Sequence, residues 1–292
     1  MSNLQLAKRR LKKSRSLWYD SWLRLKRNPT AMFGLYIIIF LALVAIFAPV
    51  LAPYDPFQIN LLESVKPPSK AHWFGTDYYG RDILSRLIYG TRISMTVGFV
   101  VQFITLVIGV TLGAIAGYFG GKVDMIIMRI VDIIMSFPGL LFIIGVRVAL
   151  GPGLFNIFIA MSVVGWTGKA RIVRSQVLSI REMEYIEAAR ALGVKTPTII
   201  FKHILPNCMA PLIVSVTMGI AGAIMSEAGL SFLGLGVQEP IPSWGSIVYE
   251  GLSYLRTAPW YTLFPGLAIA LTVLGFNLLG DGLRDALDPK LK

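Results

Sequence analysis

Long uncharged stretches separated by short charged ones dominate the pattern of this chain. No charged residue occurs between Arg27 and Asp55, and none occurs between Arg92 and Lys122. Each stretch has room for a helix of about 20 residues, the length that crosses a hydrocarbon core of about 30 Å. The pattern therefore predicts an all-α membrane protein.

About six membrane-spanning helices are expected from these stretches, the first of them near Phe33–Leu51. The second lies between Arg92 and Lys122 and carries glycines at positions 109, 113 and 117. Glycines four residues apart leave one helix face bare, so this face should pack closely on another helix. The remaining spans are expected at Met125–Val148, Leu154–Trp166, Met209–Met225 and between Arg256 and Asp281.

The third span is unusual because it holds two charged residues, Arg129 and Asp132. An ionisable residue inside a span is costly and is by default a candidate for function. Since the two lie three residues apart near the cytoplasmic end, a mutual ion pair at the headgroup level is an equally good interpretation. Pro138 should kink this helix near its middle, as suits a wall that moves.

Composition supports the same class. The chain has 292 residues, of which 55% are hydrophobic and 15% charged, and its mean hydropathy is +0.65. Although the net charge is +12, the basic residues flank apolar runs, where they set orientation and do not indicate nucleic-acid binding. One cysteine, Cys208, and two histidines, His72 and His203, exclude an intrachain disulfide and argue against a metal site.

The first 30 residues form a basic tail. They contain nine Lys or Arg residues and one acid, Asp20, a bias that predicts a cytoplasmic N-terminus. Trp18, Tyr19 and Trp22 are typical of a short helix anchored at the membrane surface. We therefore divide the chain into a tail (1–30), a first span with an extracytoplasmic loop (31–92) and a core of five spans (93–292).

Two segments should lie outside the cell. Between Pro53 and Arg92, Gly75-Thr76-Asp77 reads as a turn, and Gly80-Arg81-Asp82 should open an amphipathic helix. Asp77 and Asp82 are candidate substrate ligands, but roles as turn former and helix N-cap are more consistent with this pattern. The loop at 229–251 is rich in glycine and proline and carries acids without Lys or Arg; its first half is expected to dip back into the protein.

The longest charged segment between two apolar runs, residues 181–207, must lie outside the bilayer and have something to bind. Its residues up to Leu192 are mostly good helix formers. Paired alanines at 188 and 189 would let another surface approach the backbone, while Glu187 and Arg190 offer opposite charges beside them. The apolar face of this helix would consist of Tyr185, Ala188, Ala189 and Leu192.

A bend should follow that helix. Gly193 occupies a helix C-cap position, and Thr196 followed by Pro197 predicts the N-cap and first residue of a second short helix. Pro206 and Asn207 should end the second helix. The segment is then a bent pair of helices that docks on a partner; the alternative is an amphipathic linker lying on the membrane.

Particular residues give this chain a family resemblance. Glu187-Ala188-Ala189, then Gly193 and Leu205-Pro206, resembles the EAA loop of ABC importer permeases, which docks into the ATPase subunit. His203 stands where the general pattern has isoleucine, as it often does in the C-type permeases of peptide and nickel importers. The loop FGTDYYGRDILSRLIYG and the tail NLLGDGLRDALDPKLK also resemble that family, and the resemblance covers almost the whole chain.

The resemblance implies a type I ABC importer permease in the bacterial plasma membrane, with both termini cytoplasmic. The implied partners are a second, B-type permease, two ATP-binding subunits that hold ATP and Mg, and an extracytoplasmic substrate-binding protein. The expected contact with this binding protein lies in the extracytoplasmic loops. The residues implied for coupling to the ATPase are Glu187, Ala188, Ala189, Arg190, Gly193, Leu205 and Pro206; those implied for the extracytoplasmic face are Asp77, Arg81, Asp82 and Trp244.

Motif searches leave transport as the expected activity. There is no Gly-x-x-x-x-Gly-Lys-Ser/Thr loop, so energy should come from a partner and not from a cofactor of this chain. A secondary transporter is the main alternative, but no internal repeat is evident and Asp132 is the main acid within a span. Di- and oligopeptides are the expected cargo; nickel chelates or another small solute remain open alternatives.

Overall fold

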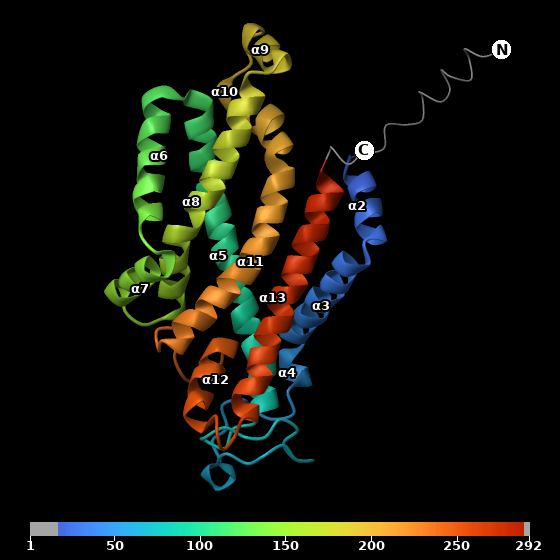
Figure 1. The fold of residues 1–292 in the computed structure, drawn as a ribbon, viewed down its shortest axis with the longest axis vertical. Coiled ribbons are helices and arrows are strands. Elements are labelled where there is room, and N and C mark those ends of the chain that lie inside the picture. Colours follow the sequence, from blue (N-terminus) through green and yellow to red (C-terminus); the bar gives the residue numbers. More distant parts are fainter. Residues whose placement is uncertain (1–16, 289–292) are drawn as a thin grey trace, which may run out of the picture.

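A computed structural model describes residues 17–288 as a bundle of helices (Figure 1). No extended strand occurs among the described residues, where the one β-bridge joins Thr76 and Asp82. The basic residues at positions 8–15, with Lys290 and Lys292, lie outside the described part. The main helices are α2 (Leu17–Arg27), α3 (Pro29–Ile46), α4 (Ala48–Leu51), α5 (Ile83–Phe119), α6 (Gly121–Ser136), α7 (Gly139–Leu150), α8 (Leu154–Arg181), α9 (Glu184–Ala191), α10 (Thr196–Thr198), α11 (Met209–Phe232), α12 (Trp244–Gly251) and α13 (Trp260–Leu287).

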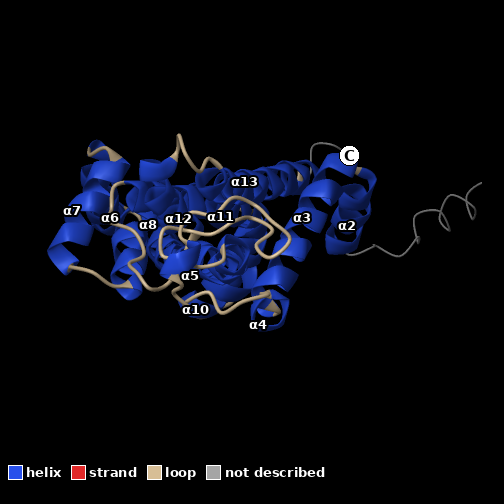
Figure 2. Ribbon diagram, turned by 90° about the horizontal axis from the view of Figure 1, so that it is seen from below, coloured by secondary structure: helices blue, strands red, loops and turns tan. Residues whose placement is uncertain are grey.

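The two ends of the bundle differ in what they carry. At one end, the upper one in Figure 1, α2 and the last turn of α13 lie on the same side as α9 and α10. At the other end lie α4, α12 and the long segment between α4 and α5; Figure 2 shows this end face-on, with its loops crossing the helices. The chain therefore separates segment 181–207 from the loops expected outside by the full length of the bundle.

Four helical stretches in the described chain are long and apolar enough to cross a membrane: α3, α5, Thr196–Phe232 and α13. The pair α6 and α7 passes the same test only when its two halves are taken together. Helix α8 is 28 residues long but carries Lys169, Arg171 and Arg174 in its second half. The six expected segments are thus all helical, and four or five of them meet the criteria for a span.

The third expected span is not one kinked helix, which corrects the prediction for Met125–Val148. Helix α6 ends at Ser136, and α7 begins at Gly139 after a bend of 94°. Pro138 is the N-cap of α7 and adopts a φ of −57°, which a proline ring favours. A proline lacks the N–H that would continue the helix, so the chain breaks here and turns α7 across the bundle.

Two helix boundaries also differ from expectation. The amphipathic helix after Asp82 and the second span are one helix, α5, of 37 residues. The helix that contains the fourth expected span does not end at Trp166, because α8 continues to Arg181. Both helices therefore extend as unbroken rods well beyond a single bilayer crossing, at roughly 1.5 Å per residue.

The bare glycine face of α5 packs against α8, as its spacing predicts. A Cβ atom at Gly109 would lie 2.6 Å from the Cβ of Lys169, and one at Gly113 would lie 2.5 Å from the carbonyl oxygen of Ala170. At Gly117 the nearest atom would be the Cβ of Val177, at 2.8 Å. Real Cβ atoms do not approach so closely, so each glycine is required for the two backbones to meet at this distance.

Gly113→Ala should separate α5 from α8. The added methyl group meets backbone on α8, which cannot rotate away, so we expect a loss of about 1–3 kcal/mol in stability. The matched control is Gly168→Ala on α8, where a Cβ meets nothing within 4 Å. Thermal unfolding of the purified chain in detergent measures both, and equal melting temperatures would contradict the close packing.

Candidate functional site

Segment 181–207 is built onto the end of α8. Ile186 of α9 is fully buried, and it packs in one cluster with Val177 and Ile180 of α8 and with Ile199 and Ile204 of the following turns. This cluster fixes α9 against α8. The segment is therefore a continuation of the helix bundle and not a loose linker.

The bend after α9 forms as the sequence predicts. Gly193 has a φ of +73°, a conformation that costs little only for glycine. Its N–H donates to the Arg190 carbonyl at 2.9 Å, and the Val194 N–H donates to the Ala189 carbonyl at 3.1 Å. This is the paired bonding of a glycine C-cap. The next short helix begins one residue earlier than predicted, with Lys195 and not Thr196 as its N-cap.

The face of α9 expected to be apolar is the one left open. On this face, Tyr185 is 44% exposed and Leu192 is 83% exposed. The buried residue of α9, Ile186, lies on a different face of the helix. Glu187 is exposed, and its carboxylate forms no ion pair or hydrogen bond with a described residue. Arg190 does not pair with Glu187; its guanidinium lies over the ring of Tyr118, 5.2 Å from the ring centre. An exposed apolar and acidic face is what a docking element would offer.

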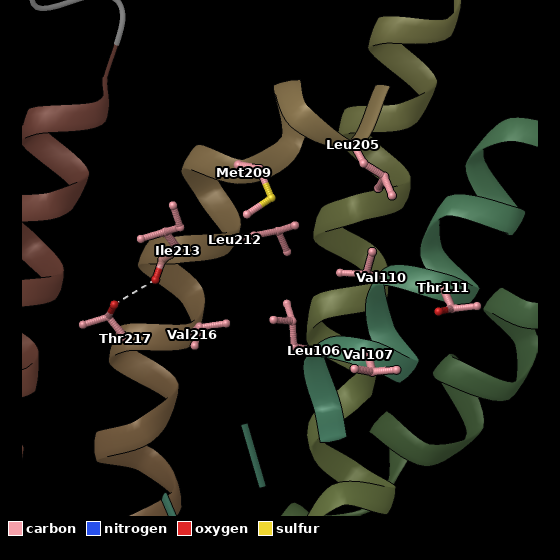
Figure 3. Close-up of a pocket in the computed structure, with 10 residues that line it drawn as sticks. All are labelled: Leu106, Val107, Val110, Thr111, Leu205, Met209, Leu212, Ile213, Val216 and Thr217. Atoms are coloured by element: carbon pink, nitrogen blue, oxygen red, sulfur yellow. Dashed lines mark hydrogen bonds between the residues drawn. The ribbon is translucent and has the colours of Figure 1, made fainter. Parts of the chain in front are cut away.

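An apolar groove of about 470 Å³ lies beside this segment, between α5 and α11 (Figure 3). Leu106 and Val110 of α5 face Leu212 and Val216 of α11 across it. Leu205, one of the residues implied for ATPase coupling, forms its upper edge, while Pro206 is exposed next to it. Movement of segment 181–207 would therefore change the walls of this groove directly.

The opposite end of the molecule holds a buried ionic network. Asp77 accepts from Arg81 at 2.5 Å and from Arg86 at 2.6 Å, and the guanidinium of Arg86 also donates to both oxygens of Glu250 on α12, at 2.5 and 2.9 Å. The Tyr261 hydroxyl donates to Glu250 at 2.7 Å. Burial alone would raise the pKa of Glu250, but its bonds and proximity to Arg86 outweigh burial and hold that pKa below its usual value.

Asp77 and Asp82 have the local roles that the pattern favoured. One oxygen of Asp77 accepts from the backbone N–H groups of Tyr79 and Arg81, both at 2.8 Å, which closes the turn. Asp82 is the N-cap of α5 and accepts from the Ser85 N–H at 2.8 Å. Both carboxylates are satisfied within the chain, so neither is free to bind a substrate in this structure.

The four residues implied for the extracytoplasmic face are all buried. Asp77 and Trp244 are fully buried, and Arg81 and Asp82 are each 3% exposed. Trp244 donates its ring N–H to the Leu87 carbonyl at 3.2 Å, which fastens α12 to α5. These side chains stabilise the outer face from inside. A partner protein would therefore contact the exposed residues that cover them.

His72 joins the long segment between α4 and α5, called the outer segment below, to the start of α5. Its Nδ1 lies 2.9 Å from Asp82 and its Nε2 lies 3.1 Å from Glu63. Burial disfavours the imidazolium, but the two hydrogen bonds to carboxylates outweigh it and raise the pKa of His72 above its usual value. The ring of Tyr54 packs beside it, with centroids 4.8 Å apart.

Charged residues near the middle of the bundle also depart from expectation. Asp132 pairs with Arg171 of α8 at 2.5 Å and not with Arg129, since α8 brings Arg171 to that level. Lys169, which follows the fourth expected span in the sequence, is 5% exposed and lies against Gly109, within the uncharged run of α5. No described side chain forms a hydrogen bond or ion pair with Lys169.

Sequence reasoning missed Arg86 and Glu227, which are buried, and Glu250, whose side chain is 8% exposed. Arg86 and Glu250 lie 164 positions apart in the chain, and a local pattern holds no signal for such a pairing. Glu227 had a usable signal, because it is an acid within the uncharged run of α11.

Two family descriptions match parts of this chain. Residues 109–292 match the family described as binding-protein-dependent transport system inner membrane component. Residues 16–68 match the N-terminal TM domain of oligopeptide transport permease C.

Curated relatives are similar along nearly their whole length. The oligopeptide transport system permease protein OppC of Bacillus subtilis is 50% identical over 96% of this chain and 92% of its own. The dipeptide permease DppC of Alkalihalophilus pseudofirmus is 49% identical over 95% and 91%. The glutathione permease GsiD of Pectobacterium atrosepticum is 45% identical over 96% and 94%.

A solved structure shares the fold. The inward-facing MetNI methionine ABC transporter contains a chain with a TM-score of 0.59 and 23% identity, which covers 70% of this chain and 98% of that one. At this identity the likeness concerns the fold alone.

Arg86→Met should destabilise the outer end severely. It leaves Asp77 and Glu250 buried without their main partner, and breaking a buried pair in this way typically costs about 3–5 kcal/mol. Arg92→Met, at an exposed position of the same helix, is the control. We expect a much lower yield of folded protein and a lower melting temperature for Arg86→Met only; equal stability of the two variants would show that the network contributes little.

Stability should also depend on pH through His72. Because its pKa is higher folded than unfolded, its contribution is fully present below the ordinary value near 6.5 and is lost as pH rises through the folded pKa. Raising the pH from about 6 to about 9 should therefore lower the melting temperature of the wild type more than that of His72→Gln. His203→Gln should behave as the wild type, and identical pH profiles for wild type and His72→Gln would refute the assignment.

Proposed function

The chain belongs to the family of binding-protein-dependent transport system inner membrane components, and we propose that its cargo is di- and oligopeptides. Family membership makes it a multi-pass inner membrane subunit of an ABC importer, a transport subunit and not an enzyme. The names of its relatives at 49% and 50% identity support a peptide cargo. The glutathione relative at 45% identity makes that tripeptide the second candidate.

The partners proposed for this chain are two ATP-binding subunits, an extracytoplasmic substrate-binding protein and a second permease of the B type. The OppC and DppC names of the relatives, together with the match of residues 16–68 to permease C, support the C-type role. ATP and Mg would be held by the ATP-binding subunits. We keep the proposed division of the chain into a basic tail (1–30), a first span with its loop (31–92) and a core of five spans (93–292).

The observation that carries the mechanism is the open face of α9 on a segment that is fixed to α8. Tyr185 and Leu192 are exposed there beside Glu187, whereas Ile186 anchors the segment from below. An ATP-binding subunit that holds this face can move α8, and α8 is locked to α5 by the glycine contacts. ATP-driven closure would then rock the helices between inward- and outward-facing states, because a partner biases a two-state bundle by its differential contacts.

The proposed topology has segment 181–207 and both termini in the cytoplasm. In a Cys208→Ala background, Leu192→Cys should react with a membrane-impermeant thiol reagent only after cells are opened, whereas Leu62→Cys should react in intact cells. Both positions are well exposed, at 83% and 90%. Reaction of Leu192→Cys in sealed cells would reverse the orientation.

Glu187→Lys and Gly193→Val should impair coupling more than folding. An interfacial charge left opposite a mismatched partner costs about 2 kcal/mol or more, and valine resists the positive φ of Gly193. Asp285→Lys is the control, an exposed acid at the same end of the bundle. The measurements are co-purification of all subunits and substrate-stimulated ATP hydrolysis in liposomes.

Two outcomes would change the conclusion. If both variants keep wild-type assembly and stimulated hydrolysis, segment 181–207 is a surface linker. If the chain alone takes up peptide under a proton or sodium gradient, without ATP-binding subunits, it is a secondary transporter.

A further inference from the structure

A polar pocket of about 240 Å³ lies at the end of the molecule opposite segment 181–207. It is formed between α12 and the turn that follows α11, and the outer segment closes one side with Tyr78. Glu239 and Tyr249 line its exposed part, and Glu250 lies deeper. None of these residues belongs to the coupling segment or to the apolar groove.

The ionic network beside this pocket holds more acids than bases. Three carboxylates, those of Asp77, Glu239 and Glu250, share hydrogen bonds with only two guanidinium groups, those of Arg81 and Arg86. The network therefore carries one excess negative charge. Behind the same wall, the buried guanidinium of Arg147 donates to the carbonyls of Leu235 and Gly236, so the excess belongs to this network and not to the whole wall. The most exposed acid of the network is Glu239.

The excess charge faces the pocket through Glu239. The two oxygens of Glu250 are taken by Arg86 and Tyr261. One oxygen of Glu239 accepts from Arg81 at 3.0 Å and from Tyr78 at 3.2 Å, but no described residue donates to the other oxygen. Glu239 is also the most exposed member of the network, at 39% of its side chain. It can accept a further donor without displacing any of the bonds present.

A second carboxyl group lies behind the pocket wall. Glu227 is 1% exposed, and its Oε1 accepts from Ser231 at 2.7 Å and from Ser243 at 2.9 Å. Its Oε2 is buried without a partner, which is uncommon for a buried polar atom. Ser231 lines the pocket, so this unsatisfied acid stands one side chain away from the cavity.

Aromatic rings complete the wall. Tyr78 and Tyr249 both line the cavity, and the faces of such rings attract cations. The guanidinium of Arg81 already lies over the Tyr78 ring, 5.8 Å from its centre, so Tyr249 is the ring that a further cation would meet. Tyr249 is 47% exposed and has its hydroxyl close to Gly234, at the mouth. The carbonyls of Gly234 and Gly236 already accept from Gln238. One open carboxylate oxygen beside a phenol ring suits a primary ammonium group better than a metal ion, which prefers several carboxylate or carbonyl ligands.

We propose that this pocket binds the protonated amino end of a peptide as it enters the permease, with Glu239 as the direct partner of the ammonium group. The identification of that ammonium group as a peptide's rests on the proposed function. The pocket itself requires only a primary ammonium ion with a small substituent. Peptides with a blocked amino end would lack the charge that the site recognises.

Saturation-transfer NMR on the full chain, purified with the subunits that accompany it but without the binding protein, tests this directly. Trialanine should bind, N-acetyl-trialanine should not, and ethylammonium should displace trialanine. Glu239→Gln should weaken trialanine binding about tenfold, the effect of about 1.4 kcal/mol. Glu182→Gln, an exposed acid at the other end of the bundle, should leave binding unchanged.

The outcomes separate the pocket from the proposed function. If trialanine and its acetylated form give equal signals, or if Glu239→Gln binds as the wild type does, the pocket is not an ammonium site, whether or not the complex transports peptides. If ammonium binding behaves as predicted but the complex takes up no peptide, the site stands and the cargo is wrong. Tyr249→Leu is a second, independent test of the pocket because it leaves the ionic network unchanged. It should also weaken binding, so the test does not depend on Glu239→Gln folding normally.

Discussion

Close contact between α5 and α8 is the constraint on which the rest of this structure depends. Inside a bilayer, helices gain little from the hydrophobic effect, so tight packing has to come from backbones that can approach each other. Gly109, Gly113 and Gly117 provide that approach along three successive turns. The two helices consequently run together as one unit, and what each carries at its ends becomes linked to the other.

The ends of this unit explain how an outer site and an inner site can communicate. At the outer end, Asp82 caps α5 and Arg86 ties it to Glu250 of α12, next to the polar pocket. At the inner end, α8 passes into segment 181–207 through the cluster around Ile186. A shift of this rigid unit would move the pocket wall and the groove beside Leu205 together, without any flexible connection between them.

What the sequence could predict was local, and what it missed was long-range. The glycine spacing on α5, the cap at Asp82 and the positive φ of Gly193 follow from short patterns, since each concerns one helix face or one turn. The partner of Asp132 and the burial of Lys169 depend on the level at which α8 crosses its neighbours, which no short pattern contains. The 94° break at Pro138 was anticipated as a kink, but its size depends on where α7 packs.

Distance measurements between spin labels test most directly whether α5 and α8 move as one unit. Labels at Phe119, the last residue of α5, and at Met183, just after α8, are both exposed, at 60% and 45%. In the assembled complex, the distance between them should stay the same with and without ATP, while the distance from Leu192 to the exposed Asp285 on α13 changes. A change between Phe119 and Met183 that exceeds the width of the distribution, with a constant distance from Leu192 to Asp285, would contradict the rigid unit.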